Sequence, residues 1–130
     1  MKSIEGNKII VTLQKDLIKN GLKVDALIKG FKAIRPYALE DEDPTVVKVS
    51  RLVYEHLEEE KTFSIPLPPE EAISTEELEE GEEPEMIISE IETDDDRVES
   101  IDYLLSLMLD RDNDDNKQDL FAYRDALKEY

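Results

Sequence analysis

Three aspartates alternate along the chain with the spacing at which a calcium-binding loop begins. Asp110, Asp112 and Asp114 match the first three oxygen ligands of such a loop. The remainder departs from the pattern, because Asp115 stands where the turn needs glycine and Phe121 where a bidentate glutamate belongs. The sequence therefore favours an acidic turn between two helices and assigns no metal ligand, with an acidic calcium-binding protein kept as an alternative.

His56 is the only histidine, and so the only side chain whose ordinary pKa suits acid–base work near neutral pH. Its neighbours along a predicted helix are glutamates, among them Glu55, Glu58 and Glu59. General-base catalysis needs a histidine held in a cleft by a positioned partner, and the sequence indicates neither. We expect His56 to be a surface residue on the flank of an apolar helix face.

The chain contains none of the motifs GxGxxG, P-loop, GxSxG and HExxH. Paired carboxylates, which glycosidases use, discriminate nothing here, because 34 Asp and Glu residues will always place some pair at a suitable separation. There are no cysteines, which excludes disulfides and thiolate metal sites. The sequence predicts a protein that is not an enzyme and has no cofactor.

Charge is unevenly distributed along the chain. The formal net charge is −18, yet residues 1–37 contain eight basic and three acidic residues. Six of these cations fall on two predicted helices: Lys15, Lys19, Lys23, Lys29, Lys32 and Arg35. A helix-turn-helix reader of DNA would need a polar base-reading cluster, which the second helix lacks, and the acidic remainder would repel the duplex. We expect these cations to meet acidic residues of the same chain or of another protomer.

Residues 69–96 contain fourteen Asp and Glu residues, and no basic residue occurs between Lys61 and Arg97. Runs of this kind are typical of solvated connections. We expect one small domain over residues 1–130, with residues 69–96 as an acidic connecting segment inside it.

Apolar residues at helical spacing predict helices over about 12–20, 24–34, 44–59, 98–108 and 116–130. Pro36 is expected to end the second helix, because the residue before a proline avoids the α conformation. Asp43 followed by Pro44 predicts the start of the third, as a capping side chain and a proline at the first helical position.

The last two helices have weaker start signals. Asp94, Asp95 and Asp96 are favourably placed near the positive N-terminus of the fourth helix. Asn116 followed by Asp119 resembles a capping box for the fifth.

Three short stretches have the composition of strands rather than of helices. Residues 8–13 are rich in β-branched side chains and fit either a helix or a strand, whereas residues 62–67 and 86–91 are apolar and extended in character. The expected fold is therefore mainly α: a bundle of four to five helices, with a small two- or three-stranded antiparallel element from these stretches as an option.

The N-terminal residues lack the apolar core of a secretory signal, and no stretch approaches the roughly 20 apolar residues of a membrane span. We expect a cytoplasmic protein without membrane contact. Basic and acidic residues are concentrated in different parts of the chain, and the sequence contains no catalytic, cofactor-binding or metal-binding motif. Together these features predict an interaction module that presents an acidic face to a basic protein partner or to another copy of itself. A mimic of nucleic acid, whose carboxylates occupy the groove of a DNA- or RNA-binding protein, is an alternative.

Overall fold

Five helices make up most of the described chain, which confirms a mainly helical fold. The computed structural model describes residues 4–68, 70–71, 86–87, 91–110 and 112–130. Within them the helices are α1 (Ile4–Asn20), α2 (Val24–Glu40), α3 (Pro44–Glu60), α4 (Asp94–Leu109) and α5 (Asp114–Glu129).

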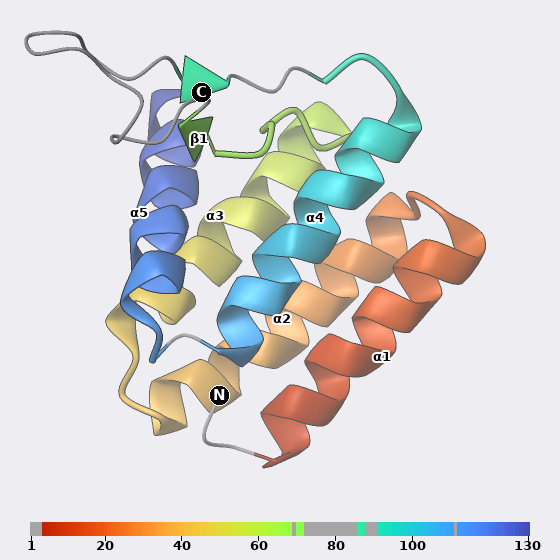
Figure 1. Cartoon of the computed structure of the whole chain (residues 1–130). Helices are drawn as coiled ribbons and strands as arrows, with labels where there is room; N and C mark the ends of the chain where they lie inside the picture. Colours follow the sequence, from red (N-terminus) through yellow and green to blue (C-terminus); the bar gives the residue numbers. More distant parts are fainter. Residues whose placement is uncertain (1–3, 69, 72–85, 88–90, 111) are drawn as a thin grey trace, which may run out of the picture.

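The helices run alternately up and down along one bundle (Figure 1). α1 packs against α2 and α4, α5 packs against α3 and α4, and α2 also packs against α3. They therefore close a ring in the order α1, α2, α3, α5 and α4, in which α3 and α5 run in the same direction (Figure 1). Because α3 and α4 run in opposite directions, the last turn of α3 and the first turn of α4 lie at the same end of the bundle (Figure 1).

Each helix contributes one apolar face to a continuous core. Almost fully buried side chains from the five faces include Leu17, Phe31, Val53, Leu104 and Tyr123. The extended chain after α3 adds Phe63 and Ile65 to the same core. Removal of this apolar surface from water is the main favourable term in folding.

The strand alternative for residues 8–13 is wrong, because these residues lie inside α1. Ile10 and Leu13 are buried there together with Leu17, at the spacing of one helix face. The β-branched run from Ile9 to Val11 lowers helix propensity only slightly, and packing against α2 and α4 outweighs that cost.

The expected end of the second helix at Pro36 is also wrong. α2 continues through Pro36 to Glu40. An interior proline costs about 3 kcal/mol through its missing N–H and its ring clash. Ile34 and Ala38, on either side of it, are both fully buried, and their packing in the core keeps the helix intact.

The predicted start of the third helix is confirmed. Asp43 is the N-cap of α3, and its side chain accepts a hydrogen bond of 3.1 Å from the backbone N–H of Val46. Pro44 occupies the first turn. The helix ends at Glu60, where Lys61 takes a left-handed conformation with φ of 61°.

The start of the last helix differs from the expected one. Asn113 is the N-cap of α5, and its Oδ1 accepts from the backbone N–H groups of Asp115 and Asn116. Asn116 is therefore inside the helix, and its Nδ2 donates to the carbonyl oxygen of Asp110 at 2.7 Å. This bond ties the turn before α5 to the end of α4.

The predicted β element is not supported. Residues 62–67 are extended but belong to no strand, and the described part of the chain shows pairing only between the two-residue strands β1 (Glu70–Glu71) and β2 (Met86–Ile87). Residues 88–90 of the expected third stretch lie outside the described residues. So do residues 69, 72–85 and 88–90 of the expected acidic connection, whereas Asp94 to Asp96 form the first turn of α4.

Candidate functional site

Glutamates crowd the last turn of α3, where a helix least favours them. Glu58, Glu59 and Glu60 end this helix, and no basic residue accompanies them in the last turn. The negative end of the helix dipole and mutual repulsion both disfavour carboxylates at this position. Glu58 is neutralised by Lys32 of α2, with 2.7 Å between Nζ and Oε1. Glu59 and Glu60 are exposed and form no ion pair with any described residue.

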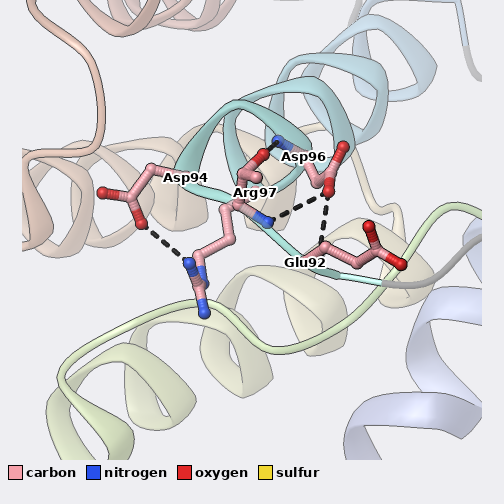
Figure 2. A network of polar contacts seen from close by, with 5 residues as sticks. Glu92, Asp94, Asp96 and Arg97 are labelled. Carbon is pink, nitrogen blue, oxygen red and sulfur yellow. Dashed lines mark hydrogen bonds and ion pairs between the residues drawn. The ribbon is translucent and has the colours of Figure 1, made fainter.

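A second group of carboxylates surrounds the start of α4, where a capping box fixes the backbone (Figure 2). The hydroxyl of Thr93 accepts from the N–H of Asp96, while Asp96 Oδ2 accepts from the N–H groups of Thr93 and Glu92. These two backbone donors, from Glu92 first and then Thr93, lower the pKa of Asp96. Asp96 is thus a structural anion that positions its neighbours.

The other carboxylates of this turn remain available. Asp94 accepts from Arg97 Nη1 at 2.7 Å, yet 77% of its side chain is exposed (Figure 2). Asp95 is exposed and forms no ion pair within the described chain. Glu92, just before the helix, is exposed as well.

The two groups of carboxylates lie at the same end of the bundle (Figure 1). The extended chain after α3 is anchored beside α4, because Ser100 Oγ donates to the carbonyl oxygen of Ile65 at 2.8 Å. We call the surface formed by Glu59, Glu60, Glu92, Asp94 and Asp95 the acidic end. It is a concentration of exposed negative charge on ordered backbone, suited to cations.

His56 lies in a different place from the one expected. It is buried, with only 7% of the residue exposed, between the rings of Phe63 and Tyr130 at 5.6 and 4.7 Å from its centroid. Its Nε2 accepts a hydrogen bond of 3.1 Å from the backbone N–H of Ser64. Burial lowers the pKa of His56, against an opposing influence of Glu60 and Glu59. The lone pair that a general base would use is therefore already engaged.

The three aspartates of the calcium-like pattern fall around the turn between α4 and α5. Asp110 caps the end of α4, Asp112 lies in the turn, and Asp114 opens α5. Among the residues that the structure describes, no group of three or more His, Cys, Asp or Glu is placed to hold a metal ion.

The basic front of the chain is spread over α1 and α2, and it meets carboxylates at few points. Lys32 pairs with Glu58 as described, and Lys8 pairs with Glu5 at 3.7 Å. The remaining cations of the predicted set form no ion pair with a described carboxylate: Lys15, Lys19, Lys23, Lys29 and Arg35. Pairing with carboxylates of the described residues therefore accounts for one of the six.

The sequence predicts an acidic segment over residues 69–96 and places glutamates beside His56, but it does not indicate that Glu59 and Glu60 belong with the start of α4. A signal for the glutamates of α3 was present, since three consecutive glutamates precede Lys61 where a helix dipole disfavours them. What the sequence does not show is that the last turn of α3 and the first turn of α4 lie at the same end of the bundle (Figure 1).

None of the described helices has the length and apolar character needed to cross a membrane. Comparison of the chain with protein-family models, with curated proteins and with solved structures finds no match.

Proposed function

We propose that this protein is a non-catalytic interaction module whose acidic end binds a basic protein partner. The observation that carries this proposal is the position of Glu59 and Glu60 in the last turn of α3. Their charges work against the helix dipole and gain no ion pair within the described chain. A partner that brings Lys or Arg side chains to this turn would relieve the repulsion.

The first turn of α4 contributes further carboxylates to the acidic end. Asp94 and Asp95 are held by a capped helix start, so their carboxylates need little ordering when a partner binds. Opposite charge also steers encounter and raises the association rate, and this effect weakens as salt screens it. Binding should therefore be fast and strongly dependent on ionic strength.

His56 supports a non-catalytic role, because its ring is buried and its Nε2 is engaged by Ser64. A catalytic histidine needs a free nitrogen in reach of a substrate proton.

The test compares two variants that lose the same charge at opposite ends of the bundle. One carries Glu59→Gln, Glu60→Gln and Asp95→Asn at the acidic end. The matched control carries Glu40→Gln, Asp112→Asn and Asp115→Asn, which belong to the opposite end (Figure 1). The probe is a fluorescent oligolysine peptide, and its affinity is measured by anisotropy at low and at raised salt.

We expect the acidic-end variant to bind about tenfold more weakly, since three rim charges of about 0.5 kcal/mol each sum to that factor. The affinity of the control variant for the peptide should fall by less than about twofold. Equal losses would mean that the peptide responds to total charge alone, and the acidic end would then have no special role.

A further inference from the structure

An open cavity of about 490 Å³ lies where α2 turns into α3, away from the acidic end. It has an apolar part and a basic part: Leu39, Pro44 and Val47 form the first, and Arg35, Lys48 and Arg51 form the second. Glu42 and Asp43 complete the lining. Asp43 is engaged as the cap of α3.

Lys48 is influenced by other cations. Lys128 and Arg124 of α5 and Arg51 of α3 act on its charge, Lys128 most strongly. This influence, that of Lys128 above all, lowers the pKa of Lys48. Lys48 and Lys128 form no ion pair with a carboxylate in the described residues.

This grouping of cations is unusual for the composition of the chain, which has 34 acidic residues against 16 basic ones. Arg51 reaches Glu55 only at 3.7 Å, and Arg124 is paired with its neighbour Asp125 at 3.0 Å. The repulsion between Lys48 and Lys128 is therefore left without a compensating anion in the described structure. A bound anion would remove it.

Arg35 adds a guanidinium to the lining of the same cavity. Its Nε is buried and has no hydrogen-bond partner among the described residues. A guanidinium presents donors in a planar fork that matches phosphate and carboxylate oxygens.

We infer that this cavity binds a small phosphomonoester. Its phosphate would be held by Arg35, Lys48 and Arg51, and its organic part would lie against Leu39, Pro44 and Val47. A phosphomonoester is favoured over a single carboxylate because its second charge and its three oxygens can satisfy several cations at once. The site shares no residue with the acidic end.

The test uses phenyl phosphate as a phosphomonoester with an apolar body, and inorganic phosphate as the anion alone. Binding is followed by the backbone amide NMR signals of the full chain. We expect saturable shifts centred on residues 35–51, with phenyl phosphate binding more tightly than inorganic phosphate. Lys48→Gln should weaken the binding of phenyl phosphate at least about tenfold, which is the factor that corresponds to the loss of one charge-assisted hydrogen bond.

Lys15→Gln is the matched control, because it removes one exposed lysine from α1 and should leave the affinity unchanged. Lys48→Gln should also melt no lower than the unchanged protein, since it relieves the repulsion with Lys128. Absence of saturable binding would overturn the inference, as would equal loss in both variants or equal affinity for the two anions. A lower melting temperature of Lys48→Gln would overturn it too, by showing that Lys48 stabilises the fold.

Discussion

The hydroxyl oxygens of Ser100 and Tyr123 lie 2.9 Å apart inside the core, where α4 meets α5. Ser100 Oγ also donates to the carbonyl oxygen of Ile65, so the hydroxyl of Tyr123 is the donor between them, and its single hydrogen is shared between Ser100 Oγ and the carbonyl oxygen of Ser100. Burial raises the pKa of Tyr123 well above its ordinary range. Two helices and the extended chain after α3 are thus joined by one small polar network that water does not reach.

Removal of either hydroxyl should destabilise the fold. Ser100→Ala leaves the Ile65 carbonyl without this donor in a buried position, and we expect a loss of about 1–3 kcal/mol in the free energy of unfolding. Tyr123→Phe should cost about 1 kcal/mol. The double variant should cost less than the sum, because the residues share a hydrogen bond. Urea unfolding followed by circular dichroism gives these values.

Ser106→Ala is the control for this network, since Ser106 belongs to the same helix but its hydroxyl is exposed. Its effect should stay within about 0.5 kcal/mol, as for ordinary surface substitutions. A loss as large as that of Ser100→Ala would show that α4 is sensitive to serine removal in general.

Pro36→Ala should stabilise the protein. The alanine restores a backbone N–H to the interior of α2 and removes the ring clash, which together are worth about 3 kcal/mol. Against this, the unfolded chain regains up to about 1 kcal/mol of entropy. We expect a net gain of about 1–2 kcal/mol, measured by urea unfolding. A loss of stability would indicate that α2 is built around the bend that the proline imposes.

Gly30 and Leu13 should be energetically linked, because α1 and α2 approach closely at this pair. A Cβ on Gly30 would lie 2.7 Å from both Cδ atoms of Leu13. In the unchanged protein, Gly30→Ala should therefore fail to give the gain of about 1 kcal/mol expected for glycine to alanine in a helix. In a Leu13→Ala background the same substitution should give that gain. A double-mutant cycle with no coupling would contradict the close approach.

Helix positions were predictable where periodicity and caps agree, as at Asp43 and Pro44. The prediction failed at Pro36, because a local steric rule carries no information about Ile34 and Ala38, which the core buries on both sides of it. For residues 8–13, neighbouring helices decided between two conformations that the local sequence permits.

The candidate site was less predictable than the fold, since its parts are distant in the sequence. His56 is buried by Phe63 and Tyr130, which reach it from the extended chain and from the end of the chain. Helical spacing alone gives no indication of either contact. The influence of Lys128 on Lys48 likewise depends on α3 and α5 being neighbours, which the local sequence does not indicate.

The stability of the protein should fall as the pH drops from 7 to 5, because of His56. Its pKa in the folded state is lower than the ordinary value of 6.5, chiefly through burial. Below that value the unfolded chain takes up a proton that the folded one does not, so the free energy of unfolding decreases with falling pH. The slope is at most about 1.4 kcal/mol per pH unit, and it ends once the pH passes the folded pKa.

Many carboxylates also begin to titrate in this range, so the contribution of His56 must be isolated by difference. His56→Gln is the suitable reference, because its amide oxygen can accept the hydrogen bond from Ser64 and carries no titrating proton. The difference in unfolding free energy between the two proteins should shrink from pH 7 to pH 5, and parallel curves would contradict a lowered pKa. Glu60 and Glu59 oppose the effect of burial. Their replacement by Gln should therefore lower the pKa of His56 further and extend the decline to lower pH.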